Sequence, residues 1–157
     1  MDRKNIRCRD VGAYAHALTR GKEYVVENTD ENKFRVVGDH GRKVWISKDY
    51  FCSTKENILL LQKWNFDQDI ESELFVEVTL TFNDGSERWC TLTTPENLVQ
   101  YFSNNCMEPP GLYMKHLIIM KAMNKEDVEA TFRYLDSQNE LVGLTIPLNE
   151  ILFENDV

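Results

Sequence analysis

The chain has 157 residues, of which 42% are hydrophobic and 28% are charged, and its formal net charge is −8. This apolar content is typical of a folded globular protein and excludes an intrinsically disordered chain. No apolar run reaches the roughly 18 residues that a membrane-spanning helix needs, and no secretion signal follows Met1. We therefore expect a cytoplasmic protein with reduced thiols at its four cysteines, Cys8, Cys52, Cys90 and Cys106.

The charge is unevenly distributed. Residues 1–53 hold 11 Lys or Arg and 8 Asp or Glu, a net charge of +3, whereas residues 54–157 hold 7 and 18, a net charge of −11. A polar stretch over 53–57 separates these parts. The sequence thus predicts two domains, 1–53 and 58–157, and the acidic second domain favours a basic partner over nucleic acid.

Residues 1–53 predict a small β-barrel of five short strands. β-Branched and aromatic residues alternate around 24–26, 34–37 and 43–46, which favours pleated strands. Gly38 and Gly41 bracket a tight turn, and residues 47–50 predict one 3₁₀ turn before the last strand. So many short strands in so few residues indicate a closed or nearly closed barrel.

The segment from about residue 5 to 53 resembles a Src-homology-three-like barrel, most closely the short barrel modules of bacterial and phage proteins. The resemblance rests on two features. The first is the pattern that ends the domain in this family, matched here by Gly41, Ile46, Tyr50 and Phe51, and the second is the lysine- and glycine-bearing turn at 18–26. Val44 and Ser47 stand where that family has a glycine and a proline, and the long acidic first loop is missing. The resemblance implies the fold, and the missing groove residues argue against binding of proline-rich peptides.

Residues 58–157 predict an α+β domain with the order β-β-β-α-β-α-β, in which two helices pack on a mostly antiparallel sheet. Residues 58–66 suit either a strand or a short helix, and a strand is favoured. Residues 74–82 and 87–93 form a hairpin around Asp84-Gly85. A two-residue loop would place Leu80 opposite Trp89, and a three-residue loop would place Cys90 opposite Val78.

Two helices and two more strands complete this domain. Thr94 and Pro95 begin a helix with an apolar stripe at Leu98, Tyr101 and Phe102. Residues 116–120 predict a buried strand, and Asn124 caps a helix whose apolar face is Val128, Thr131, Phe132 and Leu135. Residues 141–148 predict a last strand, at a sheet edge because of Pro147.

The sequence carries no recognised catalytic motif. Its seven glycines fit neither a phosphate loop nor a dinucleotide fingerprint, and its cysteines and histidines lack the spacing of a metal site, so we expect no cofactor and no metal. Cys8, His40 and Cys52 could meet only if the barrel closed. A cysteine hydrolase would have to pair Cys90 or Cys106 with His116.

Two surfaces are candidate partner-binding sites. The first holds Trp45 and Tyr50; Phe34 and Trp45 are favoured as core residues, and Tyr50 as the surface contact. Arg35, Arg42 and Lys43 lie nearby, which is weak evidence for nucleic-acid binding. The second is the acidic run Asp67, Asp69, Glu71 and Glu73, a solvated loop or a docking loop for a basic partner.

The sequence therefore predicts a non-enzymatic protein-interaction protein. Its most concrete form is an acidic inhibitor or immunity-type protein that neutralises a basic toxin or nuclease. The alternatives are a small cysteine hydrolase and a scaffold subunit that oligomerises through the barrel or an edge strand.

Overall fold

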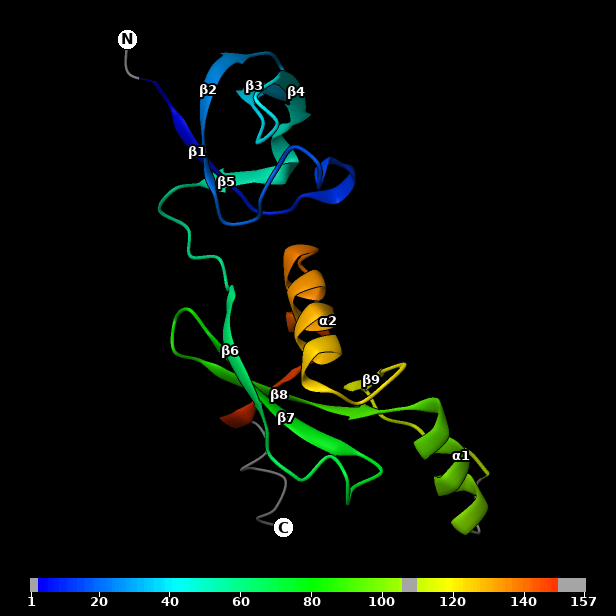
Figure 1. Ribbon diagram of the computed structural model, residues 1–157. Coiled ribbons are helices and arrows are strands. Elements are labelled where there is room, and N and C mark those ends of the chain that lie inside the picture. The colour runs from blue at the N-terminus through cyan, green and yellow to red at the C-terminus, as the bar shows by residue number, and fades with distance from the viewer. Residues whose placement is uncertain (1–2, 106–109, 150–157) are drawn as a thin grey trace. The chain divides into compact units, whose positions relative to one another are not determined.

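The structure, a computed structural model, describes residues 3–105 and 110–149 and divides into two compact units (Figure 1). Unit 1 comprises Met1–Leu60 and Ser137–Asn139, and unit 2 comprises Leu61–Asp136 and Glu140–Val157. Both are rich in strands, and the helices belong to an α+β fold, as predicted. No helix in the described part of the chain is long and apolar enough to cross a membrane.

Unit 1 is a five-stranded antiparallel sheet with the strand order β4-β3-β2-β1-β5. Its strands are β1 (Asn5–Cys8), β2 (Glu23–Thr29), β3 (Lys33–Val37), β4 (Lys43–Ser47) and β5 (Phe51–Ser53). The 3₁₀ turns η1 (Gly12–Tyr14) and η2 (Lys48–Tyr50) lie in its connections, and η2 stands where the sequence predicts it. Among the described residues β4 does not pair with β5, so the barrel is not closed.

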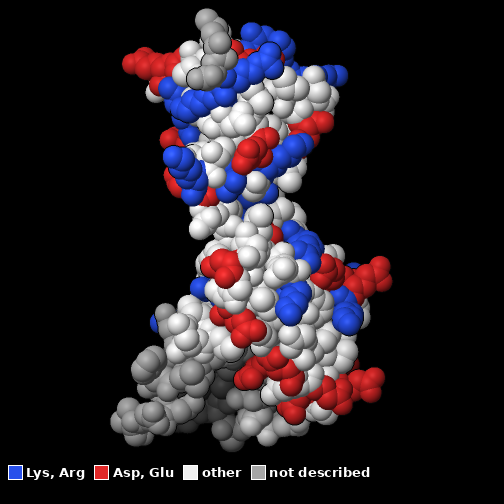
Figure 2. Space-filling view, turned by 90° about the vertical axis from the view of Figure 1, so that its left-hand side faces the viewer, with Lys and Arg blue, Asp and Glu red and all other residues white. Residues whose placement is uncertain are grey.

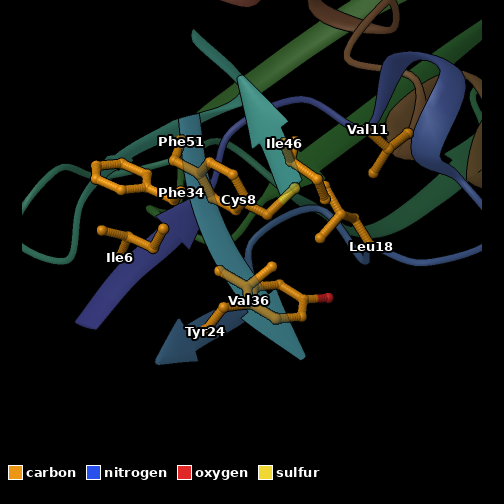
Figure 3. Packing of buried hydrophobic residues seen from close by; sticks show 9 residues of the cluster. All are labelled: Ile6, Cys8, Val11, Leu18, Tyr24, Phe34, Val36, Ile46 and Phe51. Carbon is orange, nitrogen blue, oxygen red and sulfur yellow. The ribbon is translucent and has the colours of Figure 1, made fainter. Parts of the chain in front are cut away.

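The core of unit 1 is built from alternate residues of these strands, with Val11 and Leu18 from the connection between β1 and β2. Figure 3 shows nine of its side chains: Ile6, Cys8, Val11, Leu18, Tyr24, Phe34, Val36, Ile46 and Phe51. The Phe51 ring meets the rings of Tyr24 and Phe34 edge-on, at centroid distances of 6.3 and 6.0 Å. Burial of each large apolar side chain stabilises the unit by roughly 1.5–3 kcal/mol.

Hydrogen bonds of Asp39 link the β3–β4 turn to the segment before β2. Its carboxylate accepts hydrogen bonds from Thr19 Oγ1 at 2.7 Å and from Lys22 Nζ at 2.6 Å. Its backbone N–H donates to the Ala17 carbonyl at 2.8 Å. The side chain and the backbone of one turn residue thus hold two distant loops together.

Unit 2 is a sheet with the order β10-β8-β7-β6, to which β9 adds by parallel pairing with β8. The order of elements is the predicted one: β6 (Leu61–Phe66), β7 (Val76–Phe82), β8 (Glu87–Thr93), α1 (Pro95–Asn104), β9 (Leu117–Ile119), α2 (Lys125–Ser137) and β10 (Ile146–Pro147). Residues 61–66 form a strand, which decides between the two structures that the sequence allows for 58–66.

The β7–β8 hairpin has the three-residue loop. Gly85 has φ +83°, its N–H donates to the Phe82 carbonyl at 2.9 Å, and the Phe82 N–H donates to the Ser86 carbonyl at 2.9 Å. The left-handed glycine adds one residue to the loop and fixes the register. Val78 therefore lies opposite Cys90, and Leu80 lies opposite Arg88.

Helix α2 covers the core face of this sheet. Val128 and Phe132 are fully buried, and the Phe132 ring meets the Trp64 ring edge-on at 5.4 Å. Trp64 pairs with Leu80 across the strands and shares its face. The Trp64 indole N–H also donates to the carboxylate of Glu129.

Both helix caps stand where the sequence predicts them. Thr94 Oγ1 accepts from the Asn97 N–H at 3.1 Å, and Asn124 Oδ1 accepts from the Asp127 N–H at 2.8 Å. Helix α1 packs less deeply than α2: none of its residues is buried, and its Tyr101 ring meets Phe75, the residue before β7.

The prediction of one strand over 141–148 is wrong in extent. A 3₁₀ turn, η3 (Val142–Leu144), precedes the two residues of β10, which pair with β8 at the sheet edge. The Arg88 guanidinium holds this segment by donating to Thr145 Oγ1 at 2.8 Å, to the Thr145 carbonyl at 2.8 Å and to the Val142 carbonyl at 3.1 Å. These polar contacts favour a turn over a longer strand.

Candidate protein-binding site

The face of β2, β3 and β4 that points away from the core exposes apolar side chains. Val25 and Val37 are each 41% exposed, and Trp45 is 37% exposed. Trp45 lies opposite Arg35 in the β3–β4 ladder, and Val37 lies opposite Lys43. Because Phe34 and Ile46 point into the core, alternation places their neighbours Arg35 and Trp45 on the outside.

These strands form a shallow groove of about 1290 Å³; Trp45 does not line it but lies opposite Arg35, which does. We call it the outer-face groove and define it by the residues Lys4, Val25, Glu27, Arg35, Val37 and Lys43. Arg3, Lys22, Glu23 and Asp39 also line it. Its lining combines valine side chains with charged side chains of both signs.

The groove is lined by more cationic than anionic side chains. Lys43 Nζ lies 2.9 Å from Glu27 Oε2, and Lys22 Nζ lies 2.6 Å from Asp39 Oδ1. A third pair joins Arg7 to Glu23 at 2.9 Å. Arg35 has no ion-pair partner among residues 3–105 and 110–149, and Lys4 Nζ lies 5.0 Å from the centre of the Phe34 ring. The groove thus keeps a positive charge after its internal pairs are formed.

The surface view agrees with this distribution. On the face in Figure 2, unit 1 shows many Lys and Arg side chains with Asp and Glu among them, and unit 2 shows groups of Asp and Glu with some Lys and Arg. The net charges of +3 for residues 1–53 and −11 for 54–157 follow the same division. Each unit therefore presents a field of its own sign.

The aromatic residues of unit 1 differ from the expectation in one respect. Phe34 lies in the core as predicted, but Trp45 is exposed, so the prediction of a buried Trp45 is wrong. Tyr50 is half-buried, and its ring meets the Tyr14 ring edge-on at 5.5 Å. Trp45 is thus the more accessible of the two predicted contact residues.

The acidic run lies in the loop between β6 and β7, and its four carboxylates have different environments. Asp67 accepts from Asn65 Nδ2 at 2.9 Å and from Thr79 Oγ1 at 2.7 Å. Asp69 Oδ1 accepts from the Glu71 N–H at 3.0 Å. Glu71 and Glu73 are exposed. All four residues are exposed, and the carboxylates of Asp67 and Asp69 also order the loop.

The geometry does not bring Cys90 and His116 together as a catalytic pair. Cys90 shares the buried face of β8 with Leu92, and burial, aided by the charge of Asp67, raises the pKa of its thiol to about 12. The His116 ring lies 4.0 Å from the Trp89 ring, and Trp89 alternates with Cys90 along the strand. A thiol with this pKa is protonated at neutral pH and is a poor nucleophile. Cys106 lies outside the described residues.

Trp89 and His116 form a polar cluster that sequence reasoning missed. The indole N–H and both imidazole nitrogens are buried and have no hydrogen-bond partner among the described residues. Burial lowers the pKa of His116, and the charge of Glu77 opposes that shift. The pairing of β9 with β8 creates this contact, which the sequence spacing of 89 and 116 does not show.

The cluster of Cys8, His40 and Cys52 does not form. Cys8 pairs with Phe51 and Arg7 pairs with Cys52, so alternation directs the two thiols to opposite faces. Within the part of the chain that the structure describes, no three His, Cys, Asp or Glu residues could hold a metal ion together.

No protein-family model, curated protein or solved structure matches this chain.

Proposed function

We propose that this chain is a non-enzymatic protein-interaction protein that binds its partner at the outer-face groove of unit 1. The observation that carries the proposal is the exposure of Trp45 on the face that also exposes Val25 and Val37, opposite Arg35, which has no ion-pair partner among the described residues. Tryptophan and arginine are the residues most enriched among those that dominate binding energy at protein interfaces. An exposed apolar patch with a polar rim is characteristic of such an interface.

The charges of the groove favour a protein over nucleic acid. Glu23, Glu27 and Asp39 line it together with the cations, and the whole chain has a net charge of −8. Nucleic-acid affinity grows with the number of phosphates that a protein neutralises, so carboxylates inside the groove oppose it. A protein partner can match charges of both signs.

The test is affinity capture from a native lysate with matched variants. Trp45→Ala removes the exposed indole, and Tyr113→Ala removes another exposed aromatic side chain, which is 80% exposed in unit 2. The wild type and Tyr113→Ala should retain the same partner, and Trp45→Ala should lose it while its circular dichroism spectrum is unchanged. Retention of every partner by Trp45→Ala would contradict the proposal.

A second candidate function is the acidic inhibitor or immunity-type protein. The observation that favours it is the ordered β6–β7 loop, which holds Glu71 and Glu73 in solvent. Such a loop would steer a basic toxin or nuclease toward unit 2 by long-range attraction. The double variant Glu71→Lys/Glu73→Lys should abolish capture of a basic partner at low salt. The matched control Glu96→Lys/Glu140→Lys changes net charge equally and should preserve it.

A further inference from the structure

Strand β4 is an edge strand whose outward backbone groups can be assigned. Its neighbour on one side is β3, and it has no neighbour on the other side within the described chain. The Gly38 N–H donates to the Arg42 carbonyl at 2.9 Å, and the Lys48 N–H donates to the Asn32 carbonyl at 3.0 Å. These two bonds fix which residues of β4 face β3.

In an antiparallel ladder, hydrogen-bonded and non-hydrogen-bonded pairs alternate. Positions 42, 44, 46 and 48 therefore point their backbone groups toward β3. Lys43, Trp45 and Ser47 point theirs toward the open edge, and they lie opposite Val37, Arg35 and Lys33 in non-hydrogen-bonded pairs. The residue at the centre of this open edge is the exposed Trp45.

The charges of the side chains along the β4 edge indicate which kind of segment can pair with it. Residues 42–48 contain Arg42, Lys43 and Lys48 and no carboxylate; Lys43 is paired with Glu27, so Arg42 and Lys48 supply the excess positive charge. Lysines on edge strands commonly prevent association between sheets, because two copies would bring like charges together. The same charges disfavour a second copy of this chain and favour a segment that carries carboxylates.

We propose that an extended acidic segment of a partner protein pairs with β4 and adds a strand to the sheet of unit 1. The outward N–H and C=O groups of Lys43, Trp45 and Ser47 would supply the main-chain hydrogen bonds, as in other complexes that form by strand addition. Alternate side chains of the segment would lie against the Trp45 indole and near the cations of the edge. This mode rests on the proposed function, since both use the face around Trp45.

Ser47 allows a test that removes one outward N–H and spares the β3–β4 ladder. Ser47 has φ −53° and ψ 140°, close to the angles that proline imposes, and its N–H points to the open edge. Ser47→Pro removes that donor together with the hydroxyl, whose oxygen accepts from the Asp49 N–H. Ser47→Ala removes the hydroxyl alone and is the matched control.

The probe is a short blocked peptide in which glutamate and valine alternate. Titration into the ¹⁵N-labelled full chain should slow amide exchange at Lys43, Trp45 and Ser47 and shift the indole signal of Trp45. Ser47→Pro should weaken binding about fivefold, the effect of one net hydrogen bond, and Ser47→Ala should leave it unchanged. A peptide with lysine in place of glutamate should not bind.

A backbone-methylated version of the acidic peptide separates strand addition from simple surface attraction. It keeps every side chain and loses the N–H groups that would pair with β4, so it should not bind. Equal binding of the methylated peptide, or no binding of the parent peptide, would overturn strand addition while leaving the Trp45-dependent capture intact. Wild-type self-association in ultracentrifugation that Ser47→Pro abolishes would overturn it in favour of a second copy. Loss of Trp45 dependence in capture would instead reject the proposed function.

Discussion

The phenol of Tyr24 lies 3.1 Å from both carboxylate oxygens of Asp39 and donates to that carboxylate. The same phenol oxygen accepts from the Thr19 N–H at 2.8 Å. Tyr24 is 5% exposed, so these bonds lie at the margin of the unit 1 core. One hydroxyl thus joins β2, the turn before it and the β3–β4 turn.

Tyr24→Phe should lower the free energy of unfolding of the chain by about 1–2 kcal/mol. The phenyl ring would still fill the core, but the Thr19 N–H would lose its acceptor and Asp39 would lose a donor. Urea unfolding monitored by a unit 1 signal measures the change. Tyr113→Phe alters a largely exposed tyrosine and should have no effect; an equal loss in both variants would refute the role of the Tyr24 hydroxyl.

Unit 1 should lose stability in alkali through Tyr24. Burial, together with the neighbouring Asp39 carboxylate, raises the pKa of Tyr24 from 10.0 to about 12. The folded state therefore binds this proton more tightly than the unfolded state, so the contribution is complete below pH 10 and is lost as pH rises toward 12. Urea midpoints between pH 9 and pH 12 should fall more steeply for the wild type than for Tyr24→Phe. Parallel curves would contradict this assignment.

Unit 2 should lose stability as pH falls below 6.5. Burial lowers the pKa of His116, so the unfolded state binds the proton more readily than the folded state. The stabilising contribution is therefore present above pH 6.5 and is lost as pH falls through the lowered value. An NMR titration should place the His116 midpoint below 6.5, and His116→Gln should lose less stability than the wild type between pH 7.5 and pH 5.5. A midpoint at or above 6.5 would be inconsistent with a buried neutral imidazole.

The thiols of Cys8 and Cys90 should not react with an aromatic disulfide reagent in the folded protein. Both are fully buried, and burial raises each pKa to about 12, with Asp10 adding to the shift of Cys8. A Cys52→Ser/Cys106→Ser background leaves only these two thiols. We expect labelling only after guanidinium unfolding. Rapid labelling of the native chain would reopen the cysteine-hydrolase alternative for Cys90.

Gly12→Ala should destabilise unit 1 more than Gly41→Ala. Both glycines have positive φ, +46° and +79°, so alanine at either position costs roughly 1 kcal/mol of backbone strain. At Gly12 a Cβ atom would also overlap the Tyr50 ring, whereas at Gly41 it would meet no atom of the described residues within 4 Å. Thermal unfolding of the two variants measures the difference, and equal midpoints would show that the Tyr50 ring yields without cost.

The sequence predicts the elements of the fold well, because turn residues and caps act locally. Thr94, Asn124 and the Asp84-Gly85 turn each depend on neighbours a few residues away. The sequence does not predict the hairpin register, because both loop lengths satisfy the local turn preferences and packing selects between them. The extent of β10 depends on Arg88, which lies 57 residues before its acceptor Thr145.

The candidate site is less predictable, because the direction of a strand face depends on pairing. In the run Lys43-Val44-Trp45-Ile46 the apolar residues are adjacent, so alternation alone cannot say whether Trp45 or Ile46 faces inward. Pairing with β3, whose Phe34 and Val36 are buried, decides for Ile46. Likewise, charge alone groups Asp67 with Glu73, but only the structure shows that Asp67 is engaged by Asn65 and Thr79.

The attachment of β10 through Arg88 implies that this margin of unit 2 opens as a separate local-unfolding event. The two residues of β10 form little backbone pairing with β8. Three hydrogen bonds from the Arg88 guanidinium therefore contribute much of the attachment of this segment. Such margins exchange their amide hydrogens at a lower free-energy cost than the central strands. Opening would expose the edge of β8 at Arg88 and Trp89 to pairing with another chain, so we expect loss of the Arg88 side chain to favour aggregation of unit 2.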